Sequence, residues 1–461
     1  MAVSTTTPKT PAGTSGTGGN PRETAATLAL LNRAFAHYGR RDFALRLWDG
    51  TLVPADQGED THFTLVLNRP TALRRMMLPP SELALGESFL DGEWDLEGDI
   101  LAAMRLSDAF ERLSMGPGKL VSLARRVVAL PDGKPHGDGD GRSHPAAGRQ
   151  RAELRGAAHT RERDRKAVTY HYDVGNDFFR LFLDRRMIYS CGYFPTGTED
   201  LDTAQEAKLD HTCRKLRLKP GERLLDIGCG WGGLIMHAAE RFGVQAVGIT
   251  VSQPQADLAN RRIAEAGLAD RARAMVLDYR DVSSHDPFDK IVSVGMVEHV
   301  GRKSLPQHFA AAWRALKPGG LFLNHGITAA AEDPGAFNPL DRYLFQRGAF
   351  IRKYVFPDGE LIPVGEMLEA AERAGFEVRD VESLREHYAL TLRHWVRRLE
   401  AKRDEALRQV DERTYRVWRL YMAGCAHAFT TARLSVHQSL LSKPDGEGRS
   451  HLPMNRADLY A

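Results

Sequence analysis

A cysteine among aromatic residues is the first place where the sequence offers chemistry. Residues 187–194 read MIYSCGYF and place Cys191 between Tyr189 and Tyr193. None of the four cysteines of the chain forms a CxxC pair, so neither a zinc site nor a disulfide framework is indicated. A thiol in this setting is either a buried core residue or a nucleophile, and the residues alone leave both interpretations open.

A glycine-rich loop offers a second kind of chemistry. Residues 224–233 read LLDIGCGWGG, in which an apolar run reaches Asp226 and is followed by Gly228, Gly230 and Gly232. Glycines at such a position let the backbone turn sharply and pass close to a ligand. The GxGxG spacing differs from the GxGxxG fingerprint of NAD-binding loops. It resembles the first motif of class I S-adenosylmethionine-dependent methyltransferases, in which the loop holds the methionine and ribose parts of the cofactor.

Two further segments, each ending an apolar run, carry polar residues suited to the same cofactor. GITVSQPQ offers Thr250, Ser252 and Gln255 where many methyltransferases have an acidic residue for the ribose hydroxyls. The amide oxygen of Gln255 can accept from a hydroxyl, although more weakly than a carboxylate does. LDYRD places Tyr279 beside Arg280, and this ring suits an adenine slot, with ordinary packing as the alternative.

The elements that must position these residues alternate from Ala167 onward. Apolar runs are separated by segments of helical periodicity, and this alternation predicts a parallel sheet covered by helices on both faces. The helix at 305–320 is expected to stop at its glycine pair. The segment 391–442 is expected to be mostly helical, and its aromatic stripe is either a core face or the wall of a ligand tunnel.

Composition changes along the chain predict its domains. Residues 1–22 are rich in Thr, Gly and Pro, lack the apolar region of a signal peptide and are expected to be a disordered tail. Residues 23–130 read as a smaller α+β domain, 131–166 as a flexible linker and 167–461 as the catalytic domain with a helical C-terminal part. Acidic residues of the stretch 84–100, Glu93 among them, are interpreted as solvated turn and cap residues rather than as a metal site.

Composition also limits the class of protein. The 461 residues are 42% hydrophobic and 27% charged, with a net charge of +3, which is ordinary for a globular protein and too small to indicate nucleic-acid binding. No run is long and apolar enough to span a bilayer, so a cytoplasmic location with reduced cysteines is expected. Basic clusters at 161–166 and 397–403 are interpreted as solvated helix faces, with contact to anionic headgroups as the second interpretation.

Several motifs together resemble one family. They are HYDVGNDFFRLFLD, YSCGYF, LDIGCGWGG, GITVSQPQ, DYRD, VSVGMVEHVG, NHGI and FIRKYVFPDGELIP, in this order across 167–400. This set resembles the cyclopropane fatty acid synthase family, which includes the mycolic acid cyclopropane synthases. The resemblance implies a Rossmann-like doubly wound sheet with helical additions. The region up to residue 130 resembles the extra N-terminal domain of the longer bacterial members.

The resemblance also implies a reaction. A methyl group of S-adenosylmethionine moves to the cis double bond of an unsaturated phospholipid acyl chain, and a bound bicarbonate ion then removes a proton so that a cyclopropane ring closes. The implied catalytic residues, which hold the bicarbonate, are Cys191, Glu298, His325, Ile327 and Tyr388, with Tyr388 preferred to Tyr343 and Tyr354. The implied cofactor residues are Tyr189, Ser190, Asp226, Gly228, Gly230, Gly232, Thr250, Gln255, Tyr279 and Arg280.

This reaction gives Cys191 a third interpretation, in which its S–H lines the anion pocket. Glu298 beside an anion must either be protonated or accept the O–H of bicarbonate, and the sequence leaves both open. His299 is expected to have no direct role. The expected partners are membrane phospholipids, bound peripherally at the inner face, and a second copy of the chain in a homodimer; neither a metal nor nucleic acid is expected.

Other functions remain as alternatives. The same family includes enzymes that form methylene- or methyl-branched chains or precursors of furan fatty acids. A small-molecule O- or N-methyltransferase would not need the anion-site residues. A non-catalytic lipid- or cofactor-binding protein would retain the glycine loop without turnover.

Overall fold

The computed structural model describes residues 20–35, 38–79, 81–108, 125–132, 149–152, 154, 156–329 and 348–459. The chain divides into two compact units, Met1–Gly139 and Asp140–Ala461. The predicted tail and much of the predicted linker fall outside the described residues, as does Tyr343.

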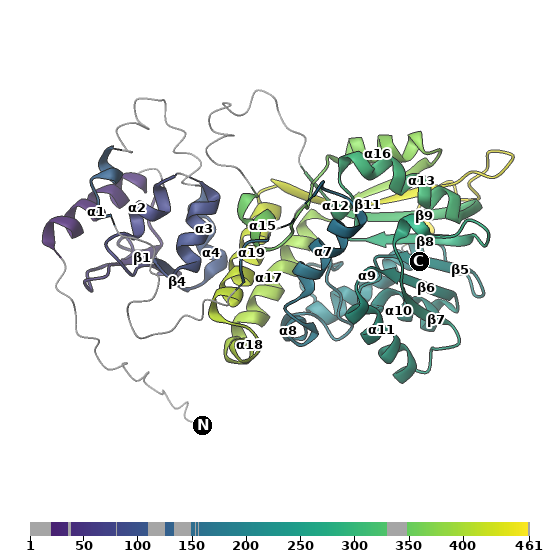
Figure 1. The fold of residues 1–461 in the computed structure, drawn as a ribbon, viewed down its shortest axis with the longest axis horizontal. Coiled ribbons are helices and arrows are strands. Elements are labelled where there is room, and N and C mark those ends of the chain that lie inside the picture. Colours follow the sequence, from purple (N-terminus) through teal and green to yellow (C-terminus); the bar gives the residue numbers. More distant parts are fainter. Residues whose placement is uncertain are drawn as a thin grey trace. The chain divides into compact units, whose positions relative to one another are not determined.

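The N-terminal unit is a small α+β structure (Figure 1). Its four-stranded sheet has the order β2-β1-β3-β4, in which β1 and β3 are parallel and the other pairs antiparallel. The described elements are α1 (Pro21–Ala34), β1 (Phe43–Arg46), β2 (Leu52–Val53), β3 (Phe63–Leu67), α2 (Ala72–Met77), α3 (Glu82–Leu90), β4 (Trp94–Gly98) and α4 (Ile100–Ala103).

The acidic stretch 84–100 agrees with its interpretation as solvated turn and cap residues at Asp91 and Asp99, which are exposed caps of α3 and α4, but not at Glu93. It lies mostly within α3 and β4, and α3 begins where the Ser81 hydroxyl accepts from the Ala84 N–H at 3.1 Å. Glu93 is buried, and its carboxylate accepts from Arg75 and from the Thr71 hydroxyl, both at 2.8 Å. This charge is therefore part of the core, and no cluster of potential metal ligands occurs among the described residues.

The second unit is built on a seven-stranded sheet with the order β10-β11-β9-β8-β5-β6-β7 (Figure 1). All pairs from β9 to β7 are parallel, and β11 is antiparallel to both β9 and β10. The strands are β5 (Arg223–Ile227), β6 (Gln245–Thr250), β7 (Ala272–Val276), β8 (Phe288–Val294), β9 (Leu316–Ala329), β10 (Glu377–Ser383) and β11 (Leu434–Ser442).

Helices cover both faces of this sheet, which confirms the predicted fold class. Successive residues of β5 point to opposite faces, so that Leu224 joins the core under α9–α11 and Leu225 the core under α13 and α16. The described helices of this unit are α7 (Arg161–Tyr172), α8 (Asn176–Phe182), α9 (Leu201–Lys215), α10 (Gly233–Phe242), α11 (Gln253–Glu265), α12 (Val297–Val300), α13 (Leu305–Ala315), α15 (Ala349–Tyr354), α16 (Val364–Arg373), α17 (Arg385–Ala401), α18 (Arg403–Gln409) and α19 (Glu412–Thr430).

One local expectation was largely confirmed and two were wrong. Residues 161–166, assigned to the linker, form the first half of α7, where Arg163 pairs with Asp358. The segment 391–442 is mostly helical, as predicted, and only its end forms a strand, β11. Helix α13 ends at Ala315, before its glycine pair, because Lys443 donates to the carbonyl oxygens of Trp313 and Leu316 at 2.8 and 2.7 Å and satisfies the helix end.

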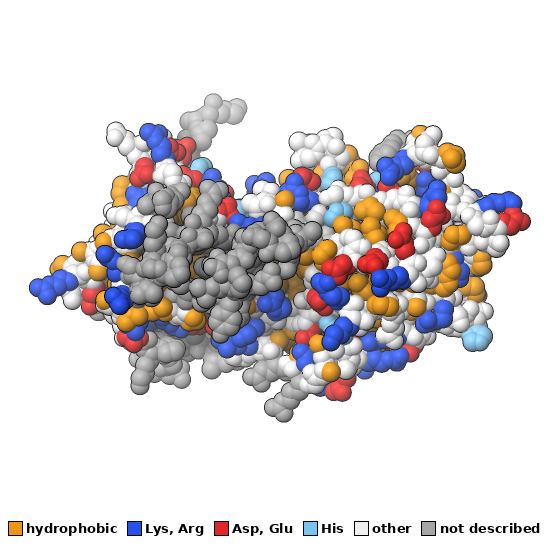
Figure 2. Space-filling model, turned by 90° about the horizontal axis from the view of Figure 1, so that it is seen from above, with side chains coloured by type: hydrophobic (Ala, Val, Ile, Leu, Met, Phe, Trp, Pro, Cys, Tyr) orange, Lys and Arg blue, Asp and Glu red, His pale blue; other side chains and the backbone are white. Residues whose placement is uncertain are grey.

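None of the helices in the described part of the chain is long and apolar enough to cross a membrane. On the face shown in Figure 2, Lys and Arg side chains alternate with Asp and Glu over the second unit.

Candidate active site

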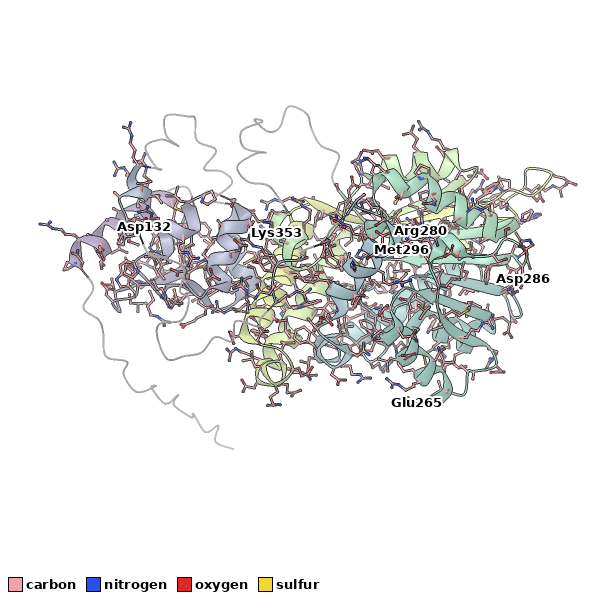
Figure 3. The ribbon with its side chains drawn as sticks, viewed as in Figure 1. Asp132, Glu265, Arg280, Asp286, Met296 and Lys353 are labelled. Atoms are coloured by element: carbon pink, nitrogen blue, oxygen red, sulfur yellow. The ribbon has the colours of Figure 1, made fainter. Side chains whose placement is uncertain are left out.

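A cavity of about 160 Å³ lies at the carboxyl ends of β5, β6 and β8. Strand β5 hydrogen-bonds with β6 on one side and β8 on the other, so this is the point where the strand order reverses, the usual ligand site of an open α/β sheet. Arg280 and Met296, which both line the cavity, lie close together in Figure 3, whereas Glu265 and Asp286 lie at the edge of the unit. All the predicted cofactor residues except Gly232 line this cavity.

The glycine loop shapes one wall. Gly228 and Gly230 have φ of 89° and 53°, in the left-handed region that favours glycine. A Cβ added at Gly230 would meet no atom within 4 Å, so this backbone borders open space. Gly232 instead immediately precedes α10 as its cap residue, and its added Cβ would lie 3.1 Å from the Cβ of Ala259. This glycine therefore allows close packing of α10 on α11, and Gly233 lines the cavity in its place.

Gln255, Tyr279 and Arg280 also line the cavity. The Thr250 hydroxyl donates to Gln255 Oε1 at 2.8 Å, which leaves this carbonyl oxygen one further acceptor position. Tyr279 packs edge-on against His308, and burial raises its pKa to about 12. Arg280 donates to Asp278 at 2.7 Å and to Asp164 at 3.0 Å, so its guanidinium ties the Tyr279 segment to α7.

Sequence reasoning missed a buried basic residue in the cavity lining, Lys208 of α9. Its ammonium group lines the cavity and donates to the Ser190 hydroxyl at 3.2 Å. Burial lowers the pKa of Lys208 to about 8 and raises that of Asp226 to about 7. Lys208 stands one turn from the buried Ala204 and Thr212, so a lysine on the apolar face of a helix was the signal that could have revealed it.

His299, for which no direct role was expected, also lines the cavity. Burial lowers the pKa of its imidazole to about 4, so the ring is neutral at physiological pH. Tyr172 of the HYDVGND motif lines the same cavity and was likewise not predicted.

The predicted catalytic residues lie outside the cavity lining. Cys191, Glu298, His325 and Tyr388 are buried, and together with the Ile327 backbone they are called the predicted anion cluster. Glu298 begins the cluster on α12, where its Oε1 accepts from the Ile327 N–H of β9 at 2.6 Å. Its Oε2 is buried and has no hydrogen-bond partner in the described ranges. Burial raises the pKa of this carboxyl group to about 7.

His325 and Tyr388 add neutral polar groups to the cluster. Burial lowers the pKa of His325 to about 3, and its Nδ1 lies 3.2 Å from Gln438 Nε2. Tyr388 lies on α17, within electrostatic reach of Cys191 and Glu298, and burial raises its pKa well above the usual value. Both side chains therefore present hydrogen-bonding groups without charge.

Cys191 is fully buried, and this burial raises the pKa of its thiol far above the usual value. The environment disfavours the thiolate that a nucleophile needs. Its Sγ donates to the carbonyl oxygens of Gly192 at 3.1 Å and Leu384 at 3.6 Å. The expectation that the S–H faces an anion therefore differs from the structure, in which the thiol is directed at the backbone.

Aromatic rings fill the space around this cluster. The Tyr189 ring stacks on Trp395 at 5.1 Å, and its hydroxyl lies 3.1 Å from that of Tyr421. Trp418 is fully buried, and Phe429 packs on Tyr388 with ring centroids 4.6 Å apart. In the described residues, the aromatic stripe of α19 is thus a core face.

Comparisons with known proteins identify the family. A family model described as mycolic acid cyclopropane synthetase matches residues 159–439, and a model described as a domain of unknown function matches residues 30–110. A probable fatty acid methyltransferase of Pseudomonas putida is 41% identical over 416 residues, which are 90% of this chain and 95% of that protein. The cyclopropane-fatty-acyl-phospholipid synthase of Escherichia coli K12 is 34% identical over 369 residues, or 80% and 85% of the two chains.

A solved structure agrees with this assignment. The mycolic acid cyclopropane synthase CmaA1, complexed with SAH and CTAB, superposes with a TM-score of 0.57 at 36% identity. The match covers 60% of this chain and 97% of that one. The chain therefore belongs to the mycolic acid cyclopropane synthetase family of S-adenosylmethionine-dependent methyltransferases, as its motifs predicted.

Proposed function

We propose that this protein transfers a methylene group from S-adenosylmethionine to the cis double bond of an unsaturated phospholipid acyl chain, with bicarbonate as the base. The observation that carries the proposal is Glu298. One of its oxygens is fixed by the Ile327 N–H, and the other is buried without a partner in the described residues. A buried polar atom of this kind calls for a polar ligand.

The residues of the cavity fit S-adenosylmethionine. The open space at Gly230 admits a ligand against the backbone. Lys208 and Asp226 present a cation and a carboxyl group suited to the amino acid end of the cofactor. When bound, the cofactor supplies an electrophilic methyl group to the alkene.

The protein's own groups then have defined tasks. The buried rings around Tyr189 exclude water and offer π faces, which stabilise a positive charge that develops on the acyl chain. Glu298, which the Ile327 N–H orients, and His325 hold the base, and the neutral Tyr388 completes the cluster. A small-molecule O- or N-methyltransferase has no need of such a cluster, which favours the alkene substrate.

The relatives support a fatty acyl substrate, since one is named a probable fatty acid methyltransferase and another a cyclopropane-fatty-acyl-phospholipid synthase. A methylene- or methyl-branched product would use the same residues. The product therefore distinguishes the candidate reactions.

Expression in a bacterial host that lacks its own cyclopropane lipids tests the proposal. We expect new fatty acids whose proton NMR spectrum shows cyclopropane ring protons. Cyclopropane and methylene products are isomers, so NMR is required to separate ring protons from vinylic ones. Vinylic protons, or an unchanged lipid profile with active cofactor binding, would contradict the proposed product.

We further propose that the protein reaches its substrate by binding peripherally to the inner face of the membrane. In the cluster 161–166, Arg161, Arg163 and Lys166 each pair with a carboxylate, and only Arg165 is exposed without an ion pair in the described structure. In the cluster 397–403, Arg397 and Lys402 are exposed and make no ion pair within the described structure. These two side chains therefore remain available to anionic headgroups.

Replacing both Arg397 and Lys402 with alanine should weaken binding to vesicles containing anionic phospholipid by roughly thirtyfold, at about 1 kcal/mol per basic residue. Cosedimentation at two salt concentrations measures this, with Lys166→Ala, which removes a paired cation, as the matched control. Binding that ignores both salt and anionic lipid would exclude an electrostatic contribution.

A further inference from the structure

His325 of the predicted anion cluster has a cross-strand partner that the sequence did not reveal. Gln438 of β11 stands directly opposite His325 of β9 in the antiparallel register. Both side chains are buried, with exposed fractions of 0% and 2%. The Gln438 Nε2 atom lies 3.2 Å from His325 Nδ1.

This contact decides which imidazole nitrogen carries the proton. A neutral imidazole has one N–H donor and one acceptor, and burial keeps His325 neutral. The amide nitrogen of Gln438 can only donate, so Nδ1 must accept and the proton must reside on Nε2. Within the part of the chain that the structure describes, Nε2 makes no hydrogen bond, so its N–H is free for a ligand.

The opposite orientation of the amide is less favourable. As placed, Gln438 leaves its Oε1 buried without a partner among the described residues. Rotating the amide by 180° would pair Oε1 with an Nδ1–H but would bury an NH2 group with two unsatisfied donors. Buried orphan N–H groups are rarer in proteins than under-satisfied carbonyl oxygens.

We propose that Gln438 is a positioning residue that holds His325 in its Nε2–H tautomer, so that the imidazole donates a hydrogen bond to the anion held beside Glu298. The inference rests on the proposed function, because it supplies the anion with a neutral donor. With the proton on Nδ1, the imidazole would instead turn a lone pair toward the anion and repel it. Gln438 thus acts through His325 and does not touch the substrate.

The tautomer is measured directly by ¹⁵N NMR of histidine-labelled protein, with the His325 signals identified by their absence in His325→Gln. We expect wild-type protein to show a protonated Nε2 and an unprotonated Nδ1 that accepts a hydrogen bond. A protonated Nδ1 in wild-type protein would overturn the inference, and this measurement needs no variant of Gln438.

Kinetics of Gln438→Met provide the second arm, because methionine keeps the length of the side chain but cannot donate. The bicarbonate concentration that gives half-maximal rate should rise about tenfold, as for loss of one hydrogen bond to a charged group, while the dissociation constant for S-adenosylmethionine stays unchanged. Ser439→Ala is the matched control, since Ser439 is the next residue of β11 and its buried hydroxyl has no partner in the described structure.

The outcomes separate this inference from the proposed function. A wild-type rate that ignores bicarbonate depletion contradicts the proposed base, whereas the NMR arm still reports on the Gln438–His325 contact. A bicarbonate requirement that rises no further in Gln438→Met than in Ser439→Ala contradicts the positioning role alone.

Discussion

Replacing Gly230 with valine is expected to lower the affinity for S-adenosylmethionine by about a hundredfold or more, the effect of forcing extra carbon atoms into a filled site. A Cβ at this position meets no protein atom within 4 Å, so the valine side chain would project into the cavity of about 160 Å³. The fold should persist, because no neighbouring side chain has to move.

A matched control separates occupied space from backbone strain. Gly267, at the exposed end of α11, has a φ of 68°, close to the 53° of Gly230, and an added Cβ there also meets nothing within 4 Å. Gly267→Val therefore introduces similar strain far from the cavity and should bind the cofactor normally. Calorimetric titration and thermal unfolding measure both variants. Wild-type affinity in Gly230→Val would remove the glycine loop from the site.

Local motifs made the cofactor site predictable. The glycine loop, the Thr250–Gln255 segment and Tyr279 each follow a strand of the parallel sheet, and the carboxyl ends of such strands meet at one edge. Lys208 escaped prediction because the buried face of α9 also carries polar residues such as Gln205 and His211, which weaken the apolar periodicity that marks a buried lysine.

The C-terminal strands were harder to predict because their composition is unusual for strands. β10 is largely charged, and β11 carries Gln438, Ser439 and Ser442 at fully buried positions. Such polar residues conceal the apolar alternation from which strands are recognised. One of these polar residues, Gln438, contacts His325 of the predicted anion cluster, so the segment that was hardest to predict carries the proposed positioning residue.

The anion cluster could be named from family motifs, yet its geometry could not. The pairing of Glu298 with the Ile327 N–H joins a short helix to a strand across the sheet edge. The direction of the Cys191 thiol likewise depends on Leu384, which is 193 positions away in sequence. Neither contact has a signature in the sequence spacing.

Glu298→Gln is expected to lower turnover by roughly ten- to a hundredfold, the effect of losing a hydrogen bond to a charged group. Glutamine retains the acceptor for the Ile327 N–H but cannot accept the O–H of a bound bicarbonate, so the base loses its orientation. Cys191→Ser is the comparison, as its S–H already donates to Gly192 and a hydroxyl can do the same, so its loss should be smaller.

Initial rates of wild type and both variants, with and without added bicarbonate, test this prediction. Depletion of bicarbonate should slow the wild type and add little to Glu298→Gln. A Glu298→Gln protein as active as Cys191→Ser would instead indicate that Glu298 is protonated in the complex, since glutamine can replace a donating carboxyl group.

Wild-type protein and Glu298→Gln also differ in a property that can be measured without turnover, the pH dependence of stability. Burial raises the Glu298 pKa from 4.5 to about 7 in the folded protein, so between these values the folded state keeps a proton that the unfolded chain has released. The free energy of unfolding of the wild type, relative to Glu298→Gln, should therefore fall as pH rises through this window and level off above it. The full change is on the order of 3 kcal/mol. Asp226 and His325 titrate in both proteins and cancel in the difference, which urea unfolding from pH 4.5 to 8 measures. A difference that stays flat with pH would show that the carboxyl group of Glu298 is not held in a desolvated site.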